Sequence, residues 1–282
     1  MAEIGLYVHE FRPEAISNSV ELTEHLQKKG HNVRQSSDLK ENPSGFVDDL
    51  DLLVSMGGDG SILRAINLLD GQPTPVLGIN FGQLGYLTAA EPSEAFDAVI
   101  RTLEGNYDIE ERMMLKVSVE REQAESATED HALNEVVVER TAASHTVRMN
   151  VSMDGSFFTS YAADGLIIST PTGSTAYAFS ARGPIVDASH QSIQVTPVSP
   201  HMLFDRTLVL APSTQLELQV LGDRTATCTV DGREMGVLEE KDRVVCTRSD
   251  RIAKLVTFGK RDFLHPLKTK FGLEDREMSN LK

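Results

Sequence analysis

The sequence of 282 residues lacks the signals of several large protein classes. Its two cysteines, Cys228 and Cys246, lie in separate segments without a CxxC pair or a nearby histidine, so we expect buried free thiols and no zinc or redox pair. No stretch approaches the roughly 20 apolar residues of a membrane span, and the N-terminus has no signal-peptide pattern. We therefore expect a cytoplasmic protein with no membrane partner.

Positive charge is also scarce. The chain has 27 Lys and Arg residues against 42 Asp and Glu residues, which gives a formal net charge of -15. A surface this acidic disfavours nucleic acid and anionic membranes, because both repel it. Any anionic ligand would have to be held by local backbone dipoles, by a cation and by a few arginines.

Several nucleotide and metal motifs are missing. There is no GxxxxGK[ST] sequence, which excludes a P-loop enzyme, and no GxGxxG follows the first predicted strand, which disfavours hydride transfer on a Rossmann site. No HExxH or EF-hand pattern occurs, so we expect no metal site built by the protein alone.

The length and the ordinary composition indicate two folded domains. Residues 1–112 alternate strand and helix signals, which predicts an α/β domain with a parallel sheet that carries the nucleotide site. The predicted strands are 4–8, 32–35, 52–56 and 76–80, and the predicted helices are 13–29 and 92–103.

Residues 113–258 change to short alternating runs, which predicts an all-β, sandwich-like domain. The predicted strands are 115–119, 134–139, 146–153, 157–161, 166–169, 215–220, 226–230, 243–247 and 253–258. Asp154-Gly155 and Asp231-Gly232 have the composition of hairpin turns, and 121–130 is polar enough to be a loop. We expect the charged tail, 259–282, to pack back on the first domain.

The most informative segment is Gly57-Gly58-Asp59-Gly60, which follows a buried apolar run. Its glycines allow positive φ and let an anion approach the backbone, and the helix expected from Ser61 would present free N–H groups to phosphate. We therefore predict that Gly57, Gly58, Ser61 and Arg64 bind phosphate. A carboxylate in such a turn is repelled by phosphate, so Asp59 is expected to accept a proton or hold a metal ion.

Three other segments carry polar side chains. Asn134-Glu135 opens an apolar strand and could hold a ribose, Asp164 lies in a tight turn, and 170–177 is rich in hydroxyl groups. Taken alone, each has an ordinary structural explanation: a solvated strand end, an aspartate that caps its own turn, and a helix N-cap. Ser174 lacks the GxSxG frame of a hydrolase nucleophile.

Together, in this order and spacing, these four segments resemble the NAD kinase family over residues 51–258. A GGDG turn alone also occurs in phosphofructokinases and in lipid kinases of the diacylglycerol and sphingosine type. The segment Thr170-Pro171-Thr172-Gly173-Ser174-Thr175-Ala176-Tyr177 is much more specific. The resemblance implies an α/β domain followed by a β-sandwich domain.

The resemblance also implies an activity, in which ATP phosphorylates the 2′-hydroxyl of the adenosine ribose of NAD to give NADP. Asp59 matches the general base. The residues that match NAD-binding positions are Gly60, Tyr86, Asn134, Glu135, Asp164, Thr172, Thr175, Ala176, Tyr177 and Ser180. The family further implies Mg²⁺ or another divalent cation with ATP, polyphosphate as an alternative donor, and a homodimer or homotetramer.

The sequence departs from the family pattern at two positions. Ser61 replaces a more usual threonine and keeps its hydroxyl, whereas Ala163 replaces a glycine and requires an ordinary φ before Asp164. The alternatives are a lipid kinase, whose second motif Gly-Thr-Gly-Asn-Asp is absent from 78–85, and a non-catalytic NAD(P)-binding sensor. A phosphofructokinase is disfavoured because the second half is β-rich.

Overall fold

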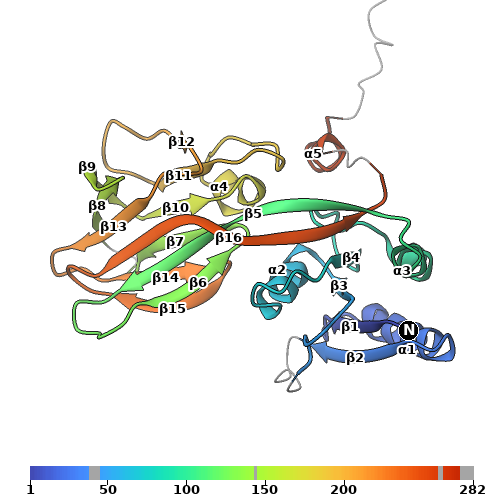
Figure 1. The fold of residues 1–282 in the computed structure, drawn as a ribbon. Helices are drawn as coiled ribbons and strands as arrows, with labels where there is room; N and C mark the ends of the chain where they lie inside the picture. Colours follow the sequence, from blue (N-terminus) through green and yellow to red (C-terminus); the bar gives the residue numbers. More distant parts are fainter. Residues whose placement is uncertain (38–44, 143–144, 260–262, 274–282) are drawn as a thin grey trace, which may run out of the picture. The chain divides into compact units, whose positions relative to one another are not determined.

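The computed structural model describes residues 1–37, 45–142, 145–259 and 263–273 (Figure 1). The chain divides into two compact units. Unit 1 comprises Met1–Glu111 with Ala253–Lys282, and unit 2 comprises Arg112–Ile252. The strands β5 (Asp108–Glu120) and β16 (Arg243–Thr257) each contain a point where the chain passes from one unit to the other.

Unit 1 is built on a parallel sheet with the strand order β2-β1-β3-β4. Its strands are β1 (Glu3–Val8), β2 (Asn32–Ser37), β3 (Leu52–Gly57) and β4 (Val76–Asn80). Both β3 and β4 are buried along their whole length, as expected for central parallel strands covered on both faces. Leu255 near the end of β16 pairs with Val76 and extends this sheet.

The helices of unit 1 begin and end where the sequence provides the signals. Helix α1 (Pro13–Lys28) has proline at its start, and Gly30 follows it at φ 84°. Helix α2 (Asp59–Leu68) begins directly after β3, α3 (Ala95–Leu103) follows a 3₁₀ turn, η1 (Pro92–Glu94), and α5 is Leu264–Phe271. No helix in the described part of the chain combines the length and apolar character needed to cross a bilayer.

The sheet order explains where a ligand site can form in unit 1. Strands β3 and β4 are neighbours, and Gly57 at the end of β3 is in register with Asn80 at the end of β4. The turn after β3 and the loop 81–85 after β4 therefore leave the sheet at the same edge, which is the usual place for ligands in parallel α/β sheets.

Unit 2 consists of two antiparallel layers. One has the order β12-β11-β10-β7-β14-β15, and in the other β16, β13, β8 and β9 are consecutive, with β5 and β6 paired beside β16. The strands not yet given are β6 (Thr128–Ala132), β7 (Glu135–Arg140), β8 (Val147–Met153), β9 (Ser156–Ala163), β10 (Gly165–Ser169), β11 (Ile193–Val198), β12 (Leu208–Leu210), β13 (Leu216–Leu221), β14 (Ala226–Val230) and β15 (Arg233–Leu238).

The core of unit 2 is formed by the inner faces of the two layers. Val138 and Ile168 from one layer share a fully buried cluster with Val151 and Leu218 from the other. On the outer face of the six-stranded layer, Ala178 of helix α4 (Tyr177–Ser180) packs on Val137 of β7 and Ile167 of β10. Cys228 and Cys246 are both free and buried.

The predicted fold class, a parallel α/β part followed by an antiparallel β sandwich, is confirmed. Both Asp-Gly pairs form hairpin turns, since Asp154, Gly155, Asp231 and Gly232 all have positive φ. Some details were wrong. The predicted strands 243–247 and 253–258 form the single strand β16, the predicted loop 121–130 ends in β6, and β11, β12 and β15 were missed. Of the predicted tail, 260–262 and 274–282 lie outside the described residues.

Candidate functional site

The glycine turn places Asp59 as the first residue of α2, after Gly58 in an extended conformation. The expectation of positive φ is wrong, because Gly57, Gly58 and Gly60 all keep ordinary backbone angles. Gly57 is required for a different reason: a Cβ there would lie 2.2 Å from the Ser61 Oγ. A Cβ at Gly58 or Gly60 would meet nothing within 4 Å, so these positions leave open space beside the start of the helix.

The carboxylate of Asp59 is held by the backbone of the loop after β4. Oδ2 accepts the N–H of Tyr86 at 2.8 Å, and Oδ1 accepts the N–H of Leu87 at 3.0 Å. Gly85 makes this contact possible, because a Cβ there would lie 2.2 Å from the Asp59 Oδ1. The two strand-end loops of unit 1 thus fix the orientation of one acid.

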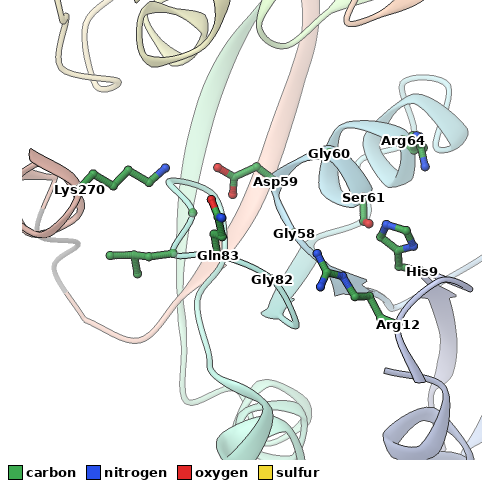
Figure 2. Close-up of a pocket in the computed structure, with 12 residues that line it drawn as sticks. His9, Arg12, Gly58, Asp59, Gly60, Ser61, Arg64, Gly82, Gln83 and Lys270 are labelled. Atoms are coloured by element: carbon green, nitrogen blue, oxygen red, sulfur yellow. The ribbon is translucent and has the colours of Figure 1, made fainter. Parts of the chain in front are cut away.

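Asp59 lines a cavity of about 340 Å³, which we call the Asp59 pocket. Its lining residues are His9, Arg12, Gly58, Asp59, Gly60, Ser61, Arg64, Gly82, Gln83, Leu84, Gly85 and Lys270 (Figure 2). Among these described residues Asp59 is the one acid, whereas arginine and lysine side chains come from three separate segments. In a chain of net charge -15, this is a local concentration of positive charge suited to an anion.

Helix α5 contributes to the same pocket. In Figure 2 the side chain of Lys270 extends from α5 toward the side of the pocket where Asp59 lies. Its ammonium lies 4.3 Å from the centroid of the Tyr86 ring, and the Phe263 ring is 6.4 Å from the same ring. Burial, and then the charge of Asp59, raise the pKa of Tyr86. Sequence reasoning missed His9, Arg12 and Lys270, because no spacing links them to the glycine turn.

A second group of predicted residues lies in unit 2, around the start of β7. Asn134 and Glu135 are held from one side by the carboxylate of Asp231, which accepts the N–H groups of Leu133 at 2.7 Å, Asn134 at 2.9 Å and Glu135 at 3.1 Å. On the other side, the N–H of Thr170 donates to the carbonyl of Asn134 at 2.9 Å. We call Asn134, Glu135 and their neighbours in 170–177 the Asn134 cluster.

The loop 170–176 packs tightly against this strand start. A Cβ at Gly173 would lie 2.2 Å from the carbonyl oxygen of Asn134, so only glycine fits. The Ser174 hydroxyl donates to Pro171 and also accepts the N–H of Val186, while the Thr172 hydroxyl accepts a bond from Arg112 at 3.1 Å. Ser174 is fully buried and serves the loop structure, which agrees with its rejection as a nucleophile.

Burial and nearby acidic residues raise the pKa values of Glu135 and Tyr177 in the Asn134 cluster. Burial, and then the charge of Asp231, raise the pKa of Glu135 to about 8, against a lowering effect of the Tyr177 backbone N–H. Burial also raises the pKa of Tyr177, with further contributions from Glu139, Asp164 and Glu135 in that order. Asp164 itself accepts a bond from Arg140 at 2.7 Å.

The predicted site residues therefore form two groups, each within one unit. The group in unit 1 contains Gly57, Gly58, Asp59, Gly60, Ser61, Arg64 and Tyr86. The group in unit 2 contains Asn134, Glu135, Asp164, Thr172, Thr175, Ala176, Tyr177 and Ser180. Ala163 has an ordinary φ, so the departure from glycine there is tolerated.

Both parts of the chain match known families. Residues 16–107 match the ATP-NAD kinase N-terminal domain, and residues 133–258 match the ATP-NAD kinase C-terminal domain. Among curated proteins, an NAD kinase of Citrifermentans bemidjiense is 33% identical over 289 residues, covering 98% of this chain and all of that protein. An NAD kinase of Heliobacterium modesticaldum is 34% identical over 279 residues, covering 96% and 98% respectively.

Solved structures agree. The yeast NADH kinase complexed with NADH superimposes with a TM-score of 0.89 at 25% identity, covering 97% of this chain and 89% of that one. An NAD kinase from Archaeoglobus fulgidus in complex with ATP has a TM-score of 0.74 at 23% identity, over 96% and 97%, and shows the shared fold. The fold and these matches define a kinase that combines an α/β part with a β sandwich. The chain belongs to the NAD kinase family.

Proposed function

We propose that this protein transfers the γ-phosphoryl group of ATP to the 2′-hydroxyl of the adenosine ribose of NAD. A bond forms between the 2′-oxygen and the γ-phosphorus, the bond from that phosphorus to the β,γ-bridging oxygen breaks, and ADP leaves. The hydroxyl proton passes to Asp59. The observation that carries the proposal is a single oriented carboxylate in a pocket otherwise lined by cationic and neutral residues.

The role of Asp59 as general base is supported by its orientation. Each carboxylate oxygen accepts one backbone N–H group, which leaves further lone pairs to accept a hydroxyl proton. Because both bonds come from backbone groups, the carboxylate needs no rearrangement before reaction. Such preorganisation is the main contribution that a protein makes to phosphoryl transfer.

The Asp59 pocket suits the phosphates of the donor. Gly58 and Gly60 leave the first amides of α2 accessible, and Arg12, Arg64 and Lys270 supply positive charge. We propose that Gly57 lets this turn pack against Ser61, and that Ser61 binds phosphate through its hydroxyl group. This hydroxyl has no hydrogen-bond partner among the described residues. Inorganic polyphosphate has the same repeating anionic groups and is proposed as an alternative donor.

A divalent cation fits this pocket as part of the donor. Mg²⁺ is usually held by one or two carboxylates together with substrate phosphates, and Asp59 offers one carboxylate. The described residues hold no group of three or more acidic, histidine or cysteine side chains able to bind a metal by themselves. We therefore propose that Mg²⁺ or a similar ion arrives with ATP, where it would neutralise phosphate charge.

The Asn134 cluster is proposed to hold NAD. Asn134 offers both a donor and an acceptor, and the buried Oε2 of Glu135 has no hydrogen-bond partner within the described chain, as expected for a group that meets a ribose hydroxyl. Tyr177 presents a partly exposed ring beside Asp164 for stacking. The remaining residues proposed to line the dinucleotide are Gly60, Tyr86, Thr172, Thr175, Ala176 and Ser180.

The test is Asp59→Asn with NAD, ATP and Mg²⁺, assayed for NADP. Loss of a general base should lower turnover at least about 100-fold while NAD binding is retained. Asp97→Asn, at an exposed position on α3 of the same unit, is the matched control and should behave as wild type. Near wild-type turnover of Asp59→Asn would exclude the proton-accepting role, and a wild-type protein that binds NAD without turnover would instead be a sensor.

We also propose a cytoplasmic homodimer or homotetramer. Exposed aromatic side chains gather in unit 2, where Phe158 of β9 and Phe204 have ring centroids 6.3 Å apart beside exposed Phe157 and Leu203. Exposed apolar patches of this kind commonly mark interfaces. Light scattering on the purified protein decides the point, because a strictly monomeric mass would contradict it.

A further inference from the structure

We propose that Asp231 is a positioning residue for dinucleotide binding: its carboxylate fixes the backbone of Leu133, Asn134 and Glu135 and thereby the direction of the Asn134 and Glu135 side chains. The inference rests on the proposed function, since it assumes that these side chains hold NAD. Asp231 is not among the residues predicted to contact NAD, and it acts through the backbone at the start of β7.

Hydrogen bonds of Asp231 connect two segments that lie almost 100 residues apart in the sequence. Oδ1 of Asp231 accepts the N–H groups of Asn134 and Glu135 at 2.9 and 3.1 Å, and Oδ2 accepts that of Leu133 at 2.7 Å. In return, the N–H of Asp231 donates to the carbonyl of Glu135 at 3.0 Å. Four hydrogen bonds therefore join the tip of the β14–β15 hairpin to three consecutive residues.

The opposite side of the same segment is fixed as well. The carbonyl of Leu133 accepts the Thr170 hydroxyl at 2.5 Å, the carbonyl of Asn134 accepts the Thr170 N–H at 2.9 Å, and Gly173 lies against the Asn134 backbone. The three amides of this segment thus face Asp231, as does the carbonyl of Glu135, whereas the carbonyls of Leu133 and Asn134 face Thr170. Only the side chains of Asn134 and Glu135 remain to meet a ligand, and their direction follows from the backbone.

A hairpin turn alone does not require this arrangement, as the second Asp-Gly turn shows. Asp154 and Gly155 have positive φ values close to those of Asp231 and Gly232, but within the described chain the Asp154 carboxylate accepts one backbone N–H, that of Gln215, at 2.9 Å. Asp154 is therefore a matched control in the same unit, with the same turn and residue pair but no connection to the Asn134 cluster.

The decisive variant is Asp231→Asn in the full-length protein. The side-chain oxygen of asparagine can accept the N–H groups of Asn134 and Glu135. Its NH₂ group would then face the N–H of Leu133, and because two donors cannot bond to each other, the strand start must shift. Displacements near 1 Å cost about 100-fold in well-positioned sites, and we expect NAD affinity to fall by about 10 to 100-fold. The KM for ATP should stay near its wild-type value. Isothermal titration calorimetry with NAD and steady-state kinetics measure these quantities.

Two readouts separate positioning from a general loss of structure. If Asp231 acts through Asn134, the effects of Asp231→Asn and Asn134→Ala on NAD affinity will not add in the double variant. In addition, the negative charge of Asp231 helps to raise the pKa of Glu135. The groups that face Glu135 are Asp231 on the β14–β15 hairpin and Tyr177 on α4. In Asp231→Asn the pH dependence of NAD affinity should therefore move to lower pH, and in Asp154→Asn it should not move.

The outcomes are distinct. Wild-type NAD affinity in Asp231→Asn, or an equal loss in Asp154→Asn, would overturn the proposal. If Asp231→Asn fails to fold, Asp231→Glu keeps the charge but moves the carboxylate by one methylene, and wild-type NAD affinity in that variant would also overturn it. Because binding is measured apart from turnover, a wild-type protein that binds NAD but makes no NADP would reject the kinase function alone, whereas no NAD binding would reject both.

Discussion

Gly85 offers a direct test of whether the loop after β4 positions Asp59. A Cβ at this glycine would lie 2.2 Å from the Asp59 Oδ1, 2.8 Å from its Cγ and 3.0 Å from its Oδ2. Ordinary van der Waals contact begins at 3.4 Å. The change Gly85→Ala therefore requires the carboxylate and the loop to separate by about 1 Å, because the new methyl group cannot approach the carboxylate more closely than an ordinary contact.

The expected cost follows from that displacement. The bonds from the N–H groups of Tyr86 and Leu87 to Asp59 are 2.8 and 3.0 Å long, and a separation of about 1 Å would break them. Misplacing a reacting group by about 1 Å can cost about 100-fold in rate. We expect Gly85→Ala to lower kcat by about this factor and to change the KM for NAD much less, because the variant moves Tyr86 but leaves the Asn134 cluster, which holds most of the residues proposed to bind NAD, untouched.

The assay is NADP formation with NAD and ATP varied separately. Gly82→Ala is the control in the same loop, since its Cβ would meet its nearest atom, the Asn80 Oδ1, at 3.7 Å, which is an ordinary contact. That variant should keep most of the turnover. If Gly85→Ala also turned over at nearly the wild-type rate, with a normal thermal transition, the loop would not control the position of Asp59 and the reasoning would be refuted.

Two further predictions concern the two groups of site residues. In the folded protein burial raises the pKa of Glu135 from 4.5 to about 8, so its contribution to stability is complete below about pH 4.5 and is lost as the pH rises through 8. A pKa shift of this size corresponds to at most about 5 kcal/mol in the free energy of unfolding. Because the side chain keeps some contact with water, we expect a smaller effect: between pH 5 and pH 9 the free energy of unfolding of Glu135→Gln should rise by about 2 kcal/mol relative to wild type. Parallel pH profiles in urea unfolding would contradict this. In the Asp59 pocket, Lys270→Ala should raise the KM for ATP about tenfold, because it removes one charged hydrogen bond to phosphate. Lys268→Ala is the control, since Lys268 lies on the same helix but does not line the pocket, and its KM for ATP should stay near wild type. Equal effects of the two changes would show that Lys270 does not bind phosphate.

Much of the fold could be predicted because local signals and burial agreed. The apolar runs of β3 and β4 have the length and the flanking glycines of buried parallel strands, and their observed bounds differ little from the predicted ones. Strands at the margins were harder. Strand β15 contains Gly236 at φ 101° and is mostly half-buried or exposed, and β6 is mostly polar, so neither has a clear alternation of apolar residues.

The candidate site could be predicted only where a motif was contiguous. The GGDG turn and the segment 170–177 were found because their residues are adjacent in the sequence. Arg12 and Lys270 line the same pocket from positions about 50 residues before and 200 residues after Asp59, and only the folded sheet edge connects them. Asp231 was recognised as a turn residue, correctly, but its side-chain contacts depend on the pairing of β14 with β7.

Asp59 and Asp231 show how an acidic chain can use carboxylates inside a site that must receive anions. Each accepts backbone N–H groups from a distant segment, two at Asp59 and three at Asp231, so its charge is partly balanced by amides, with a further contribution from Arg233 at Asp231. We propose that the cations of the Asp59 pocket face the donor phosphates. Hydrogen bonds between a carboxylate and backbone N–H groups thus have two different roles. At Asp59 they orient an acid that we propose takes part in the reaction, and at Asp231 they orient the strand start that carries Asn134 and Glu135. The two should respond differently to the same Asp→Asn change, which would lower turnover at Asp59 and weaken NAD binding at Asp231.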